Sequence, residues 1–205
     1  MKTLRLLFII GGLTCMLSAC EDEHYLLSEN NVTELNLQAK TAKDVELPFK
    51  AKLFTGQAED ALTEICSFTS QTDFWALEHQ VGGGNATHLG NFNVDLHFCF
   101  HIVLDDQGLP NIEGGFGEYN GAEGVEEPII EAANGDRLFV EFREAGRLVP
   151  IQNENYNFEF DDVWYITGGT GRFENASGQF VGHGMVRKDG TGTDHDWEGT
   201  INLNK

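Results

Sequence analysis

The sequence predicts an all-β domain, either a two-sheet sandwich or a closed barrel, and three observations support this fold class. Long segments alternate apolar and polar residues, as strands with one buried face do. Glycine-rich breaks separate these segments, and such breaks have the composition of tight turns. Only residues 58–78 could hold a helix, and Thr69, Ser70 and Thr72 weaken that alternative. Many strands, frequent turns and scarce helix favour a sandwich or a barrel.

The longest alternating segment, residues 92–104, predicts a strand with one apolar face. Its even positions are all Phe, Val, Leu or Ile, whereas most of its odd positions are polar. At about 3.3 Å per residue the segment is longer than most strands, so we expect a bulge or a strong bend in it. Shorter alternations at 138–142 and 197–203, and the aromatic and β-branched segment 163–167, predict further strands.

Three of the turn segments carry motifs that resemble a known family. The motifs are, in chain order, Gly84-Asn85-Ala86-Thr87-His88-Leu89-Gly90, then Ala133-Asn134-Gly135-Asp136, and then Gly168-Gly169-Thr170-Gly171-Arg172-Phe173 followed by Ala176-Ser177-Gly178. Their order resembles exported bacterial proteins with an allene oxide cyclase-like barrel, a calycin-type fold, and the last motif also looks like the dirigent proteins. The resemblance spans residues 80–201 and implies a single antiparallel β-barrel.

The resemblance says less about activity than about fold. Allene oxide cyclase itself would imply an apolar lumen that holds a fatty-acid epoxide. None of that family's catalytic groups can be placed on positions of this chain, so no catalytic residue is carried over. Since one fold hosts many functions, function has to be argued from a site.

The first twenty residues have the three parts of a signal peptide. Lys2 and Arg5 form a basic region, residues 6–17 form an apolar run too short to span a bilayer, and Leu17-Ser18-Ala19-Cys20 ends it. These last four residues resemble the lipobox of bacterial lipoproteins, which implies cleavage before Cys20 and two or three acyl chains on it. Two chains are needed for stable anchoring. The alternative is an ordinary secretory peptide with a chance cysteine.

We therefore predict a signal peptide at 1–19, an acylated cysteine and flexible tether at 20–44, and a barrel domain at 45–205. The acidic run Glu21-Asp22-Glu23 resembles the export signal of some surface lipoproteins, but it could also simply begin a solvated tether. The predicted location is the outer membrane, with the periplasmic face and the cell surface both left open.

The charge balance excludes some classes of partner. The net charge of −20 becomes −22 once Lys2 and Arg5 leave with the signal peptide. Nucleic-acid binding needs clustered Lys and Arg, so we predict no nucleic-acid partner. An anionic bilayer would not attract such a chain electrostatically, so the acyl chains have to hold it there. The predicted partners are the bilayer, through those chains, and a small apolar ligand.

Two cysteines, Cys66 and Cys99, remain after Cys15 is removed and Cys20 is acylated. In an oxidising compartment they could form a disulfide, provided that their Cα atoms come within about 4.4–6.8 Å. The other interpretation is two buried free thiols.

His97, Cys99 and His101 share one strand face and are the weak candidates for a metal site. Residues two apart on a strand are about 7 Å apart, so Cys99 could share a zinc with either histidine, but both histidines together hardly could. Further ligands would have to come from neighbouring strands, with His88, His183 or Asp95 as candidates. We predict no metal and no cofactor, because no second cluster with ligand spacing is visible.

Other chemical motifs are weaker. The segment Gly168–Phe173 lacks the Lys-Ser/Thr ending of a phosphate-binding loop, and we interpret it as a tight turn with one helical turn. The acidic segment 189–196 has threonine where a calcium-binding EF-hand needs acids, so a solvated hairpin is favoured over an irregular calcium site. Asp136 and Glu198 could be acids at a barrel mouth or plain surface charges. No catalytic residue is predicted.

The leading functional hypothesis is a membrane-anchored lipoprotein whose non-catalytic barrel binds a small apolar or amphipathic ligand or supports surface interactions. The alternatives are a cyclase or isomerase that acts inside the lumen, and a purely structural surface component. A pocket with convergent polar groups and a shifted carboxyl or histidine would favour the enzyme. A barrel packed solid with side chains would favour the structural component.

Overall fold

The computed structural model describes residues 45–121 and 128–203 of the 205-residue chain. The predicted signal peptide at 1–19, the acylated Cys20 and the tether to residue 44 lie outside the described residues. Within the described part, no helix has both the length and the hydropathy that a membrane crossing requires.

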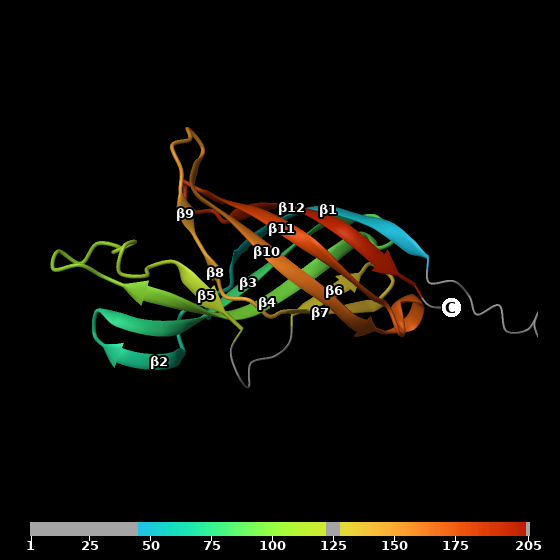
Figure 1. Ribbon diagram of the computed structural model, residues 1–205, viewed down its shortest axis with the longest axis horizontal. Helices are drawn as coiled ribbons and strands as arrows, with labels where there is room; N and C mark the ends of the chain where they lie inside the picture. The colour runs from blue at the N-terminus through green and yellow to red at the C-terminus, as the bar shows by residue number, and fades with distance from the viewer. Residues whose placement is uncertain (1–44, 122–127, 204–205) are drawn as a thin grey trace, which may run out of the picture. The chain divides into compact units, whose positions relative to one another are not determined.

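Eight strands form a closed antiparallel barrel, which confirms the all-β barrel prediction (Figure 1). Around the barrel the strands follow the order β3-β1-β12-β11-β10-β7-β6-β4, and β4 pairs back with β3. The closure leaves none of these eight strands at an open edge, which removes the exposed backbone groups of an open sheet. The strands are β1 (Glu46–Gln57), β3 (Asp73–Ala86), β4 (Gly90–Val103), β6 (Ile129–Ala132), β7 (Arg137–Phe142), β10 (Tyr156–Gly169), β11 (Ser177–Arg187) and β12 (Thr193–Asn202).

The alternation predicted for the long strand is present in β4. Phe92, Val94 and Leu96 are buried inside the barrel, whereas Asn93 and Asp95 between them are exposed. The expected bulge is absent from the β3–β4 pairing, which runs in one register from Asp73↔Val103 to Ala86↔Gly90. Strands of a barrel coil with the twisted sheet, and this coiling provides the bend without an inserted residue.

Residues 58–78 form no helix, so that alternative is wrong. The segment contains β2 (Ile65–Ser70), which forms a hairpin with the start of β3. Its Ile, Phe and Thr side chains favour strand over helix, and β3 offers a partner edge at this point. Every residue of β2 is exposed, and β2 lies outside the closed ring of strands (Figure 1).

A disulfide joins Cys66 of β2 to Cys99 of β4, with the two Cα atoms 6.1 Å apart. This separation lies within the range that the sequence argument requires. Because β2 buries almost no apolar surface, the disulfide is a main constraint that holds the hairpin against the barrel.

Reduction of this disulfide is therefore expected to loosen the hairpin rather than unfold the barrel. A disulfide of this kind contributes about 2–4 kcal/mol, so backbone amides of residues 65–70 should exchange with deuterium at least about tenfold faster after reduction. Hydrogen-exchange mass spectrometry measures this, with β12 as the internal reference. Equal acceleration in β12 would mean that the disulfide stabilises the whole barrel instead.

Three short strands extend the barrel at the end where β3 begins and β4 finishes. β5 (Glu118–Asn120) pairs with β4 and with β8 (Gly146–Arg147), and β9 (Val149–Pro150) pairs with β10. They lie toward the left-hand end of the barrel in Figure 1, and the 3₁₀ turn of the β10–β11 connection lies at the right-hand end.

The apolar core fills the barrel at the end of the β10–β11 connection. Phe49, Phe180, Leu138 and Ile201 are almost fully buried there. The connection contains the 3₁₀-helix η1 (Gly171–Phe173), whose Phe173 is fully buried and closes the end. The tight turn with one helical turn predicted from the sequence is thus confirmed.

Candidate functional site

The opposite end of the barrel contains a cavity of about 270 Å³. This volume is just below the usual range for small-molecule sites, about 300–1,000 Å³, so the cavity suits a small ligand. Its lining includes Leu62 from the β1–β2 connection and Gly190 and Gly192 from the β11–β12 hairpin. The barrel is therefore not packed solid. The remaining lining residues are Gln57, Glu78, Gln80, Leu96, Phe98, Phe100, Tyr119, Phe142, Leu148, Phe160, Asp162, Trp164, Val186, Thr193, His195 and Trp197.

Aromatic rings form much of the cavity wall, and they pack against one another. Trp164 and Trp197 lie with ring centroids 6.3 Å apart, and Phe142 lies 5.2 Å from Trp164. Glycine on β11 makes room for this wall, because a Cβ on Gly184 would lie 2.2 Å from the ring of Phe160. Such a wall offers a large, rigid apolar surface to a ligand.

A hydrogen-bonded polar network lies on the β12–β1–β3 side of the cavity. The Thr55 hydroxyl donates to Gln80 Oε1 at 2.7 Å, and the side-chain amides of Gln80 and Gln57 each donate to Glu78, both at 3.1 Å. His195 Nε2 lies 2.9 Å from the same Thr55 hydroxyl oxygen. Because the single hydroxyl hydrogen goes to Gln80, His195 donates from Nε2 and its Nδ1 is the unprotonated nitrogen.

Burial shifts the protonation of this network. Glu78 is 4% exposed, and desolvation raises the pKa of its carboxyl despite the two amide donors. Desolvation also lowers the pKa of His195 to about 4, against the opposing charge of Asp194. His195 is therefore neutral at pH 7, while Glu78 holds its proton to higher pH than an exposed glutamate.

A second acidic group, Asp162 of β10, also lines the cavity. Burial raises the pKa of Asp162 to about 6, although hydrogen bonds from Tyr119 and Trp164 stabilise the carboxylate. The Tyr119 hydroxyl donates to Asp162 Oδ1. Burial and the adjacent Asp162 charge raise the pKa of Tyr119, so the phenol stays protonated. The cavity thus combines apolar walls with two desolvated carboxyls and a neutral imidazole.

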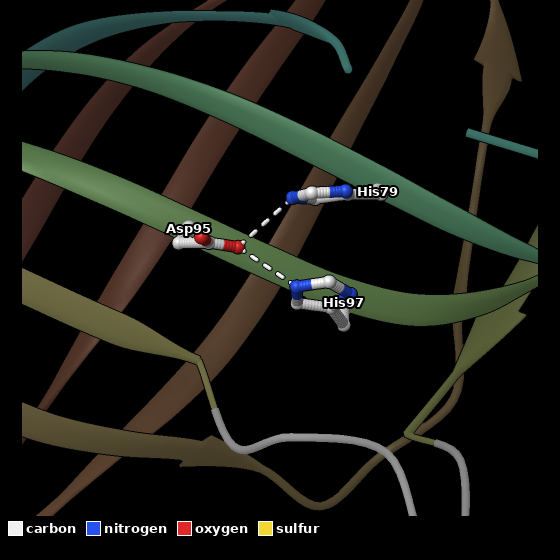
Figure 2. Close-up of side chains that lie close together, drawn as sticks. All are labelled: His79, Asp95 and His97. Carbon is white, nitrogen blue, oxygen red and sulfur yellow. Dashed lines mark hydrogen bonds and ion pairs between the residues drawn. The ribbon is translucent and has the colours of Figure 1, made fainter. Parts of the chain in front are cut away.

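The structure separates the three weak metal candidates named from the sequence. Cys99 is in the disulfide and so has no thiolate to offer a metal. His101 stacks on Trp75, with ring centroids 4.4 Å apart, and its Nε2 lies 2.8 Å from Asp73 Oδ1. His97 instead lies beside Asp95, and beside His79 of the neighbouring strand (Figure 2).

The other sequence candidates lie outside the cavity lining. Asp136 is near Arg172, 3.6 Å from its Nε, and Glu198 forms an exposed ion pair with Lys50. In the 189–196 hairpin, both the backbone amide and the hydroxyl of Thr191 donate to Asp189, as expected for a solvated turn. Asp194 accepts two hydrogen bonds from Arg187.

The residues that form the polar side of the cavity, Glu78, Asp162 and His195, are not among those predicted from the sequence. His195 precedes Trp197 by two positions, so the recognised alternation at 197–203 extended backwards would have placed it inside. Glu78 lies in the segment 58–78, which the sequence also allows to be a helix. That alternative masks the strand period that Glu78 shares with Ala76 and Gln80. Asp162 lies one residue before the predicted strand segment 163–167 and therefore outside the residues considered there.

Comparison of the chain with protein-family models, curated proteins and solved structures returned no match.

Proposed function

We propose that the barrel is a binding module for a small amphipathic molecule, carried by a lipoprotein that is held on a bacterial outer membrane through acyl chains on Cys20. The observation that supports it is the cavity at the open end, with aromatic walls and a few convergent polar groups. The ligand's apolar part would pack against Trp164, Trp197 and Phe142, and its polar group would meet Glu78, Asp162 or His195. The calycin-type assignment belongs to the same proposal.

The charge of the site favours a cationic or neutral head group. Glu78 and Asp162 are acids in a desolvated setting, and an anionic head group would be repelled once either of them ionises. A cation would compensate that charge and offset the cost of its burial. We therefore expect the barrel to prefer alkylamines and alkyl alcohols to fatty acids of equal chain length.

Titration of the full-length protein with decylamine, decanol and decanoate tests this preference. Trp164 and Trp197 line the cavity, so quenching or a shift of tryptophan fluorescence reports occupancy. Glu78→Gln is expected to weaken decylamine binding about tenfold and to leave decanol binding unchanged, because it removes a charge at constant size. Glu198→Gln, on the outside of the same barrel, is the matched control and should leave both affinities unchanged.

Two outcomes would contradict the proposal. Absence of binding by all three amphiphiles would remove the ligand-binding function. Tightest binding of decanoate would leave a binding module but reverse the proposed head-group preference.

A second candidate function is acid–base catalysis of the isomerase type within the same cavity. It is favoured by the Asp162 carboxyl, whose pKa is raised to about 6 next to Tyr119, and by the neutral His195. In that case the wild type, but not Asp162→Asn, should convert a component of a lipid extract from the producing cells, as followed by mass spectrometry. Identical extracts after both incubations would leave the binding function alone.

A further inference from the structure

A cluster of two histidines and one aspartate lies on the outer wall of the barrel, away from the cavity. His79 of β3 and His97 of β4 are direct partners in the strand register, and Asp95 precedes His97 by two positions on the same face. Asp95 Oδ1 lies 3.0 Å from His79 Nε2 and 2.8 Å from His97 Nε2, as Figure 2 shows. One potential ligand atom from each residue lies within 4.8 Å of the other two.

Both imidazole Nε2 atoms approach the same carboxylate oxygen of Asp95. A carboxylate oxygen has no hydrogen to donate, so each Nε2 must carry a proton for either contact to be a hydrogen bond. His79 Nδ1 also lies 2.6 Å from Asp60 Oδ1, so both ring nitrogens of His79 face carboxylate oxygens. A divalent cation at the centre would replace the two Nε2 protons and bind all three lone pairs at once.

The remaining contact fits the usual surroundings of a metal-bound histidine. Such a histidine generally donates its other N–H to a carboxylate, which fixes the orientation of the ring. With a metal on Nε2, His79 would donate from Nδ1 to Asp60 without any change of partner. Asp60 lies in the connection between β1 and β2, so this carboxylate reaches the cluster from a third element.

We propose that His79, Asp95 and His97 bind a divalent cation of the zinc class, with Asp60 as the positioning residue. Two imidazole nitrogens and one carboxylate oxygen are ligands that zinc accepts in tetrahedral sites that keep an open position. Zinc–ligand distances of about 2.0–2.1 Å place tetrahedral ligands about 3.3 Å apart, so the present contacts need to open by only a few tenths of an ångström. The net charge of −20 favours cations in general.

Small ring rotations complete the site. The two imidazoles are stacked, with centroids 4.0 Å apart and planes inclined by 22°, so each has to turn about its terminal side-chain torsion to direct its Nε2 lone pair at the cation. Both histidine side chains are partly exposed, at 16% and 17%, and Asp95 is exposed at 52%, which leaves room for a water as fourth ligand.

Zinc titration of the full-length protein by isothermal calorimetry tests the proposal, and cobalt substitution adds a spectroscopic signature. The wild type is expected to bind one Zn²⁺ at this cluster, and Co²⁺ in its place should give the visible absorption of a tetrahedral site. His97→Gln should weaken zinc binding at least about tenfold, and Asp60→Asn should weaken it about 10–100-fold through the lost positioning contact.

His183→Gln is the matched control, because His183 also pairs with one aspartate on the outer face of the barrel. Its Nδ1 lies 2.9 Å from Asp161 Oδ1, and no second histidine completes a group of ligands there in the part of the chain that the structure describes. This variant should keep the zinc affinity of the wild type. Circular dichroism of each variant shows whether the barrel is intact.

The outcomes are decisive in both directions. Absence of zinc binding by the wild type, or equal zinc affinity of the wild type and His97→Gln, would overturn the proposal. Because the site lies outside the cavity, amphiphile binding should be the same in His97→Gln and in the wild type, so this proposal and the proposed function can fail separately.

Discussion

Replacing Phe180 with alanine is expected to lower the free energy of unfolding by about 3–5 kcal/mol. Phe180 is 1% exposed and lies at the centre of the aromatic core, with its ring centroid 5.0 Å from that of Phe49 and 4.9 Å from that of Trp197. Trp197 belongs to β12, which pairs with β11, and Phe49 belongs to β1, which pairs with the other edge of β12. Phe180 therefore holds three strands together at the filled end of the barrel. Its removal loses buried apolar surface and leaves a cavity that rigid strands cannot fill.

Urea denaturation followed by far-ultraviolet circular dichroism measures this loss. Val181→Ala is the matched control, because Val181 is the next residue of the same strand, points outward and is 45% exposed. Its substitution should change the free energy of unfolding by no more than about 0.5 kcal/mol. Similar losses for both variants would show that the interior at Phe180 contributes no more than the surface.

The second large effect concerns the pH dependence of stability, to which two buried groups of the cavity, His195 and Asp162, contribute with opposite signs. The pKa of His195 falls from 6.5 to about 4 on folding, so between these values the unfolded chain binds more protons and stability rises with pH. The pKa of Asp162 rises from 3.8 to about 6, so over nearly the same range the folded chain binds more protons and stability falls as pH rises. In the wild type the two contributions largely cancel.

Single substitutions should separate these contributions. In Asp162→Asn the contribution that falls with rising pH is gone. The free energy of unfolding of this variant, relative to the wild type, should therefore rise by up to about 3 kcal/mol as the pH rises from 4 to 6. In His195→Gln the loss of stability on acidification is gone, so relative to the wild type this variant should gain up to about 3 kcal/mol as the pH falls from 6.5 to 4.

Urea denaturation at a series of pH values between 4 and 7 provides the measurement. Differences between variant and wild type are the useful quantity, since the many exposed carboxylates contribute equally to both. Glu198→Gln, which alters an exposed carboxylate, is expected to show a flat difference across the range. A flat difference for Asp162→Asn as well would mean that Asp162 titrates in the folded chain as it does in the unfolded chain.

Local sequence was informative where a segment's period and its turns were enough. The alternation of β4 placed Phe92, Val94 and Leu96 inside correctly, and the turn at Gly168–Phe173 was identified from its glycines. Gly171 has a φ of +57° there, a backbone conformation that glycine adopts without steric cost. The hairpin at β2 was less clear, because an exposed strand lacks the alternation that marks a half-buried one.

The candidate site was largely out of reach, because its residues come from strands far apart in the chain. Thr55 and His195 are 140 residues apart and meet only because β1 pairs with β12. The cluster of His79 and His97 depends on the register of β3 against β4, in which a shift by one residue would place either histidine opposite an inward-facing neighbour.

The sequence by itself determined that this chain is built of strands, where several of them turn, and which side chains alternate along them, because these properties depend on neighbouring residues. The tertiary structure decided between the sandwich and the closed barrel that the strand pattern left open, and it alone decided that one end is filled while the other holds a cavity, and which polar groups meet inside and outside the wall. Those outcomes depend on strand order, register and the volumes of facing side chains, which bring together residues that the linear chain keeps apart.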